Sequence, residues 1–445
     1  MRVPVSASRR PSPGTTRLGP LSDVVFAACL VAVAVKYQFA FSIPSSLYLG
    51  SVRIDAQDAV AIAMVALALF GRFWQNVTGV RRVLVAVILV IAVVGAACWV
   101  RDAGLQEGMN RERPWIYAFA ALAFGIAFAR ARWQTWRVIV VWISVGIAFI
   151  QAFALLFLGW AHGYADPTLA GGNFYGTRPL GAEAALMMVL GMLVALLSTT
   201  WKASWRYGIA LVLGLSCSWS QNRSVWLSIV VALVVYLIMS VRNRSSRGSV
   251  VVAAAVLGAL AVVSLVPVAT GFSILPVNSN AISAVRAGSD GISTTKPIPS
   301  APVYGNVKVR TVLDGSSGSP LLATGTLSFR LALWRSRLLA ERSPQEWMVG
   351  EALGPNSLNS PDSGVVRADI TSHSEPVEDL VRGGLVGVAC ILILFVLALT
   401  RRRSTPVDAW SFAVALVPFG LVYVWPEWTW VILGLCLARP LTQRS

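Results

Sequence analysis

Apolar segments, most of them about as long as a bilayer is thick, follow one another along nearly the whole chain. A helix needs about 20 apolar residues to cross the hydrocarbon core of a membrane. About twelve segments approach that length, and several of them are short. They are residues 21–43, 57–73, 83–100, 114–129, 138–160, 180–200, 206–221, 224–240, 249–269, 379–400, 407–424 and 427–438. The pattern predicts an all-α polytopic integral membrane protein with about 12 transmembrane helices.

Composition agrees with this prediction and narrows the class of protein. Of the 445 residues, 56% are hydrophobic and only 13% are charged, whereas a soluble domain has about 25% charged residues. The 17 tryptophans suit two aromatic belts at the membrane surfaces. The five cysteines all lie within apolar segments and show no CxxC or metal spacing. We therefore expect no cofactor and no metal.

The charged residues between the apolar segments alternate along the chain. One set of loops holds 20 of the 37 basic residues and only two acids, Asp23 and Asp408. The other set holds 18 of the 20 acidic residues. Short basic loops lie on the cytosolic side of membrane proteins, so we expect a multi-pass protein of the bacterial plasma membrane with both termini cytosolic. Orientation in the membrane explains the net charge of +17, and no nucleic-acid partner is needed.

The predicted topology divides the chain into five parts. The longest loop, residues 270–378, falls outside the cell or in the periplasm, and its first half is rich in Ser, Gly, Pro and Asn. The parts are a basic cytosolic tail (1–20), transmembrane helices 1–9 (21–269), the large external loop (270–378), transmembrane helices 10–12 (379–438) and a second cytosolic tail (439–445).

An amphipathic helix is predicted within this loop, near residues 326–342. Its apolar residues recur at helical spacing and the helix ends at Ser343-Pro344. Arg330 and Arg337 are seven residues apart and share one face. Such a basic helix either lies on lipid headgroups or forms an anion site above the membrane.

The stretch SHSEPVEDLVRGGLVG, residues 372–387, joins the large loop to the tenth apolar segment. It brings His373, Glu375, Glu378 and Arg382 to the start of that segment. Polar loop ends are common, so one interpretation is a solvated loop followed by an ordinary helix. The other is a titratable site at the membrane surface.

Arginines on three external segments suggest what such a site could bind. Arg178 precedes the sixth apolar segment, Arg223 lies in a short turn before the eighth, and Arg330 is on the amphipathic helix. Guanidinium groups can each contact two oxygens of a diphosphate, and a histidine can deprotonate a hydroxyl near neutral pH. There is no HExxH, P-loop or GxGxxG motif.

A family resemblance follows from these residues. His373-Ser374, nine residues and then Gly384-Leu385-Val386-Gly387 match the His-[Asn/Ser/Gln]-x9-Gly-x-x-Gly pattern of bacterial O-antigen ligases and O-oligosaccharyltransferases. Arg223-Ser-Val-Trp-Leu227 resembles their Arg-x3-Leu element. RLALW, followed by the turn from Gly350 to Gly354, resembles a segment of the wider superfamily that includes Wzy-type O-antigen polymerases. The resemblance covers roughly residues 175–390.

The resemblance implies a GT-C-like, metal-independent glycosyltransferase. Such an enzyme moves a glycan from a polyprenyl diphosphate to an acceptor hydroxyl on the outer face of the membrane, in envelope or exopolysaccharide assembly. The acceptor is a glycan, a lipid or a protein. This sequence departs from the family pattern at Ser374, where Asn is commoner, and at Pro376 and Val377, where the family often has an aromatic residue.

The roles that the resemblance implies are carried over residue by residue. The catalytic residues are His373, Arg223 and Arg330, and Gly384 and Gly387 form a structural motif. The expected substrate-binding residues are Arg178, Arg337, Glu375, Glu378 and Arg382.

Two other classes of protein remain open. A transporter or flippase of lipid-linked or polar solutes would have a similar number of spans, although the two halves of this chain show no similarity. A sensor or scaffold with an external loop would not need a histidine motif at the membrane edge. Membrane lipids are partners under every interpretation.

Overall fold

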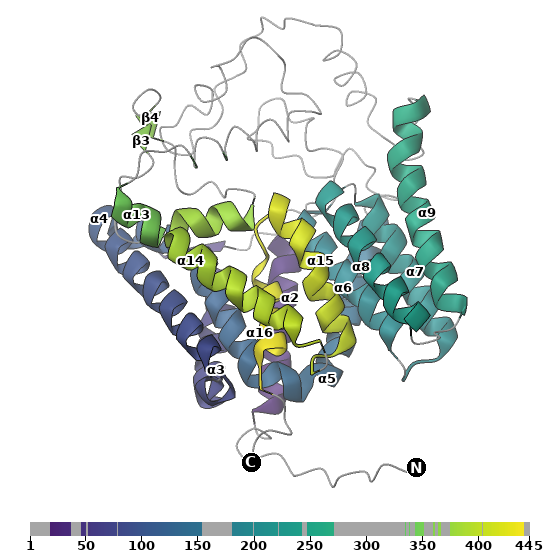
Figure 1. Cartoon of the computed structure of the whole chain (residues 1–445), viewed down its shortest axis with the longest axis horizontal. Coiled ribbons are helices and arrows are strands. Elements are labelled where there is room, and N and C mark those ends of the chain that lie inside the picture. The colour runs from purple at the N-terminus through teal and green to yellow at the C-terminus, as the bar shows by residue number, and fades with distance from the viewer. Residues whose placement is uncertain are drawn as a thin grey trace, which may run out of the picture.

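The computed structural model describes residues 18–36, 46–49, 52–77, 79–153, 180–198, 200–220, 222–242, 247–270, 334, 338, 343–350, 359–360, 364–365, 374–402 and 404–439. Most of these residues are helical (Figure 1). The helices are α2 (Gly19–Lys36), α3 (Ala56–Phe70), α4 (Val80–Phe124), α5 (Arg130–Phe153), α6 (Ala182–Leu197), α7 (Ala203–Trp219), α8 (Arg223–Arg242), α9 (Arg247–Thr270), α13 (Pro344–Val349), α14 (Glu375–Thr400), α15 (Val407–Val422) and α16 (Glu427–Leu437). A 3-10 turn, η1 (Phe73–Asn76), precedes α4, and a π-helical turn, η2 (Gly125–Ala129), separates α4 from α5.

Strands play a small part in the described residues. β1 (Ser46–Leu49) and β2 (Val52–Asp55) form one antiparallel hairpin, with Leu47 opposite Ile54. β3 (Asn359–Ser360) and β4 (Gly364–Val365) form a second, shorter one. The prediction of a mainly helical chain is confirmed.

Each predicted apolar segment is helical over most of its described length. By length and composition, Gly19–Lys36, Arg113–Phe153 and Glu375–Thr400 are long and apolar enough to cross a membrane. Large apolar side chains also lie exposed on the outside of the bundle, among them Ile62 at 70% and Val24 at 64%. An outer face of this kind suits lipid better than water.

The long helical stretch from α4 to α5 does not run straight. Phe124 and Trp136 stack with ring centroids 5.3 Å apart, whereas twelve residues of straight helix rise about 18 Å. The chain therefore turns sharply near η2, between α4 and α5.

A second reversal lies within α4 itself. Arg113 contacts Asp55 and Asp58 at the start of α3. The carbonyl of Ile126, just after α4, accepts a bond from Asn76, just before it. Both ends of α4 thus lie together and Arg113 lies far from them. The sequence predicted a connection between residues 100 and 114, whereas the backbone there belongs to α4, which also contains Pro114.

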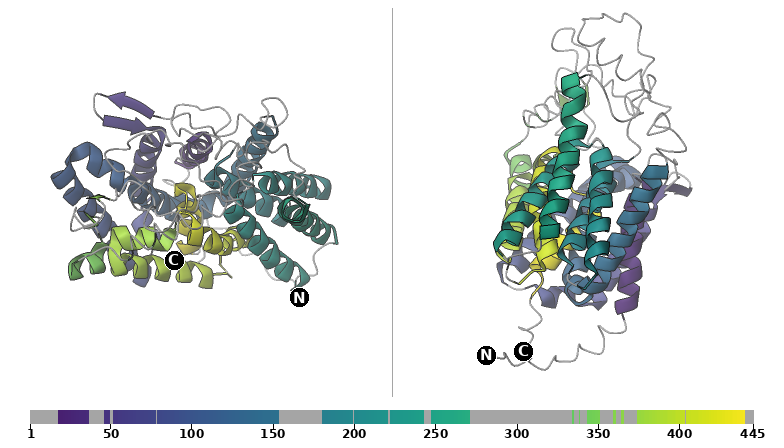
Figure 2. Two further views of the ribbon diagram at one scale, coloured as in Figure 1. Left: turned by 90° about the horizontal axis from the view of Figure 1, so that it is seen from above. Right: turned by 90° about the vertical axis from the view of Figure 1, so that its right-hand side faces the viewer.

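These reversals give the bundle two distinct ends. One end, which we call the basic end, holds Asp23, Arg81, Arg137, Arg401 and Ala438. The other, which we call the acidic end, holds Lys36, Asp55, Arg113, Glu375 and Glu427. Figure 2 shows the helices between these ends packed side by side.

The centre of the bundle consists of α6, α16 and the second half of α4. In α16 every residue from Trp428 to Leu437 is buried. It crosses α4 and η2 at two glycines that permit close approach. A Cβ at Gly125 would lie 2.3 Å from the carbonyl oxygen of Val431, and one at Gly434 would lie 2.6 Å from that of Leu122. At 11 residues α16 is about half the length of a full membrane span, and its burial explains why so short a helix is stable here.

Candidate functional site

The start of α14 is buried at the acidic end. Ser374 is the N-cap and Pro376 lies in the first turn, where a missing N–H costs nothing. Glu375 and Glu378 also lie in this turn, where negative charge interacts favourably with the helix dipole. The motif thus continues directly into a helix that is anchored in the bundle.

Two carboxylates of this segment have fixed partners. The backbone N–H of Trp425 donates to Glu375 Oε2 at 2.5 Å, which ties α14 to the loop before α16. Arg382 Nε donates to Glu378 Oε1 at 2.6 Å, one helical turn away. Asp379, 3% exposed, has one oxygen that accepts no hydrogen bond from the described residues. Three buried carboxyl groups and one guanidinium therefore share the first turns of α14.

A kink in α14 follows directly. Gly384 has φ 60° and ψ −164° inside an otherwise helical segment, a conformation that only glycine adopts readily. The backbone of α13 lies against it, since a Cβ at Gly384 would be 2.5 Å from atoms of Met348 and Gly350. Gly350 has φ 71° and lies equally close to the backbone of Arg382. Two glycines thus clamp α13 onto the kink.

Trp115 of α4 supports the other side of the kink. A Cβ at Gly383 would lie 2.4 Å from the indole ring of Trp115, and one at Gly387 would lie 3.3 Å from it. Gly384 and Gly387 therefore serve two different neighbours, α13 and α4. The sequence predicted a structural motif at this pair but not the kink.

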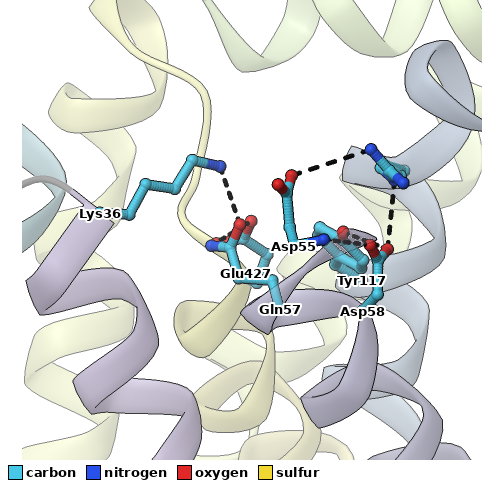
Figure 3. Close-up of polar contacts among 7 residues, drawn as sticks. Lys36, Asp55, Gln57, Asp58, Tyr117 and Glu427 are labelled. Atoms are coloured by element: carbon cyan, nitrogen blue, oxygen red, sulfur yellow. Dashed lines mark hydrogen bonds and ion pairs between the residues drawn. The ribbon is translucent and has the colours of Figure 1, made fainter. Parts of the chain in front are cut away.

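A second polar network lies beside the polar contacts at the start of α14 and connects three other helices, α2, α3 and α16 (Figure 3). Lys36 Nζ, at the end of α2, donates to Gln57 Oε1 at 2.8 Å. Gln57 Nε2 in turn donates to Glu427 Oε1 at 3.1 Å, at the start of α16. Glu427 is two residues from Trp425, so this network adjoins the start of α14.

The same network continues from α3 to α4. Asp55 and Asp58 form a capping box at the start of α3, in which the Asp55 N–H donates to Asp58 at 2.7 Å. Arg113 lies 3.8 Å from Asp55 Oδ2 and 3.1 Å from Asp58 Oδ1. The Tyr117 hydroxyl also donates to Asp58, at 2.5 Å. Helix capping and ion pairing thus use the same two carboxylates.

A small cavity of about 20 Å³ lies beneath this network. Its walls include Cys29, Gln57, Tyr117 and Glu427, with Met64 below them. The volume admits about one water molecule. The cavity thus suits a solvent molecule.

All three predicted catalytic side chains, and two of the predicted substrate-binding side chains, lie outside the described residues. This applies to His373, Arg330, Arg178 and Arg337, and to the side chain of Arg223, whose backbone begins α8. Glu375, Glu378 and Arg382 are described, and they are held by Trp425 and by one another. The predicted clustering of the arginines with His373 therefore stays a prediction.

The predicted amphipathic helix near 326–342 is described only at Trp334 and Leu338, both helical. Ser343, expected to end it, is the N-cap of α13 and accepts a bond from the Glu346 N–H at 3.2 Å. Sequence reasoning missed the network of Lys36, Gln57 and Glu427. The sequence signal nearest to this network is the pair Asp55 and Asp58 before an apolar segment. That pair is a helix-start pattern and does not indicate a network between helices.

Comparison with known proteins adds no assignment to this geometry. No protein-family model matches the chain, and no curated protein matches its sequence.

Proposed function

We propose that the chain is a membrane glycosyltransferase that moves a glycan from a polyprenyl diphosphate to an acceptor hydroxyl. The observation that carries the proposal is the motif from His373 to Gly387 together with the anchoring of its helical part. Burial of Glu375, the clamp at Gly384 and the support from Trp115 fix the start of α14. The part of the motif that follows His373 is thus held in a defined position in the bundle.

The chemistry requires a base and an anion site. The acceptor oxygen attacks the anomeric carbon of the donor sugar, and the bond from that carbon to the diphosphate breaks. The hydroxyl proton passes to His373, which is worth about 10²–10⁴-fold in rate. Arg223 and Arg330 stabilise the charge that develops on the departing diphosphate. Neither step uses a metal.

Replacement of His373 tests the proposal. Transfer by purified His373→Ala, supplied with lipid-linked glycan, should fall at least about 100-fold, while donor binding and thermal stability stay close to those of the unaltered protein. The matched control is His162→Ala, which removes the chain's other histidine and should leave transfer unchanged. Transfer by His373→Ala within a few-fold of the unaltered protein excludes the base role.

The orientation in the membrane is tested separately. Cytosolic termini and an external loop from 271 to 378 follow from the alternation of charge. Reporter fusions after Gly248 and after Ser300 should report opposite sides of the membrane. If both report the same side, the predicted topology is wrong. If the fusion after Ser300 reports the cytosolic side, the transferase proposal fails as well.

One observation favours a second function, that of a transporter. Arg113, Asp55 and Asp58 place a charged group within an apolar bundle, and such groups often mark ion or solute pathways in membranes. Under this alternative Arg113→Gln abolishes solute uptake into vesicles, and His373→Ala does not. Under the leading proposal neither variant affects uptake.

A further inference from the structure

Asp379 differs from the two other carboxyl groups at the start of α14 in the contacts that it makes. Glu375 accepts a hydrogen bond from the Trp425 N–H, and Glu378 accepts one from Arg382. Asp379 is just as deeply buried, at 3% exposed, yet its Oδ1 accepts no hydrogen bond from any described residue. An ionised carboxylate in this position is strongly unfavourable, because it has lost its water and gained no donor.

The neighbours of Asp379 on its own helix oppose ionisation further. Asp379 directly follows Glu378 and lies one helical turn after Glu375, on the same face of α14. Like charges four residues apart on a helix repel each other. Among the described residues of these first turns, Arg382 carries the only positive charge, and its Nε is bonded to Glu378. A third negative charge at Asp379 thus meets two others at close range.

The charged and titratable groups on the neighbouring elements have contacts elsewhere. On α13, Glu346 belongs to the capping box of its own helix. On α4, Arg113 and Tyr117 both contact the acids at the start of α3. On α16, Glu427 accepts from α3, and the carboxylate of α15, Asp408, lies at the basic end. None of these groups supplies a donor to the buried oxygen of α14.

A proton on Asp379 removes both difficulties. A protonated carboxyl group is uncharged and is itself a hydrogen-bond donor, so neither burial nor the adjacent negative charges oppose it. Glu375 and Glu378 are poorer places for this proton. Each of them accepts a hydrogen bond, and that bond stabilises the ionised form of the group.

We propose that Asp379 binds a proton at neutral pH and forms an uncharged acid beside the proposed transferase site. Asp379 follows His373 by six residues and has no role in the chemistry proposed above. Its part in donor binding rests on the proposed function: the diphosphate of the donor is anionic, and an uncharged Asp379 lowers the negative charge that the donor meets. The bound proton itself does not depend on transferase activity.

Infrared spectroscopy of the purified full-length protein at neutral pH detects the proton directly. A protonated carboxyl group has a carbonyl stretching band that an ionised carboxylate lacks. This band should lose intensity in Asp379→Asn, whose thermal stability should stay close to that of the unaltered protein because asparagine is uncharged and similar in size. The matched control is Glu346→Gln, which removes an exposed carboxylate and should leave the band unchanged.

Isotope labelling makes the test independent of the variant. The band should shift when the unaltered protein is made with aspartate that carries a heavy carbon isotope in its carboxyl group. If Asp379→Asn does not fold, the labelled protein decides, since labelling changes no side chain. A band that does not shift, or a labelled band that persists undiminished in Asp379→Asn, overturns the proposal.

A kinetic measurement tests the role in donor binding. As the pH rises and the band disappears, the apparent KM for lipid-linked glycan should rise about threefold or more in the unaltered protein. In Asp379→Asn, which cannot ionise, the KM should keep its neutral value. Loss of the band without a change in KM excludes the role in donor binding. Full transfer by His373→Ala, in contrast, would end the proposed function and leave the infrared result standing.

Discussion

At each end of the bundle, the less common charge makes the contacts compared here. We call it the minority charge: it is negative at the basic end and positive at the acidic end. At the basic end, the acids Asp23 and Asp408 each bind one arginine and one tryptophan. At the acidic end, the bases Lys36, Arg113 and Arg382 each join neighbouring turns or helices through a carboxylate or an amide. Several of these contacts join separate helices, as Asp408 joins α15 to α5 through Arg137.

The largest expected effect comes from removing a minority charge at the basic end. Asp408→Ala leaves Arg137 and Trp133 without their shared acceptor in a site where Asp408 is fully buried. We expect a loss of about 3–5 kcal/mol in the free energy of unfolding, measured by denaturant titration in mixed micelles.

A double replacement controls for this loss. Asp408→Leu combined with Arg137→Met removes both charges and should be less destabilising than Asp408→Ala alone. A loss below about 1 kcal/mol for Asp408→Ala would show that the minority acids are not the organising groups.

At the acidic end, the backbone contributes as much as the charges do. Gly384→Ala places a methyl group against the α13 backbone at a positive φ, and we expect a loss of about 3 kcal/mol. Gly146→Ala in α5 is the control, because a Cβ there meets no atom within 4 Å. Equal thermal stability of the two variants would mean that the clamp between α13 and α14 does not contribute to folding.

The smallest expected effect sharpens the comparison. Tyr117→Phe removes one donor to Asp58, which keeps Arg113 and the Asp55 N–H as partners. We expect a loss of about 1 kcal/mol in the same titration. If Tyr117→Phe lowers the free energy of unfolding as much as Asp408→Ala does, the Tyr117 hydroxyl stabilises the acidic end more than the ion pair between Arg113 and Asp58 does.

The helices could be predicted from the sequence because apolar length is a local property. The segments 182–197 and 407–422 are almost wholly apolar, and the structure has helices there. The separation of charge was also visible, since acids are nearly absent from alternate loops. The prediction was less accurate at the polar stretch before Pro114, where the backbone stays helical within α4.

The pairings at the two ends could not be predicted in this way. Arg137 and Asp408 are 271 residues apart, and Gln57 and Glu427 are 370 apart. No local pattern specifies such partners. The kink at Gly384 is similar, because its conformation depends on Gly350 from another segment. For His373 and the arginines of the proposed site, the motif spacing is the support available from the sequence.

The burial of α16 has a consequence for biosynthesis. α16 forms part of the centre of the bundle and crosses α4, which is made more than 300 residues earlier. Until α16 arrives, the glycine contacts at Leu122 and Gly125 have no partner, and Arg401 has no helix terminus to bind. Premature termination even ten residues before the end of α16 therefore leaves an open bundle exposed to quality-control proteases for its whole lifetime.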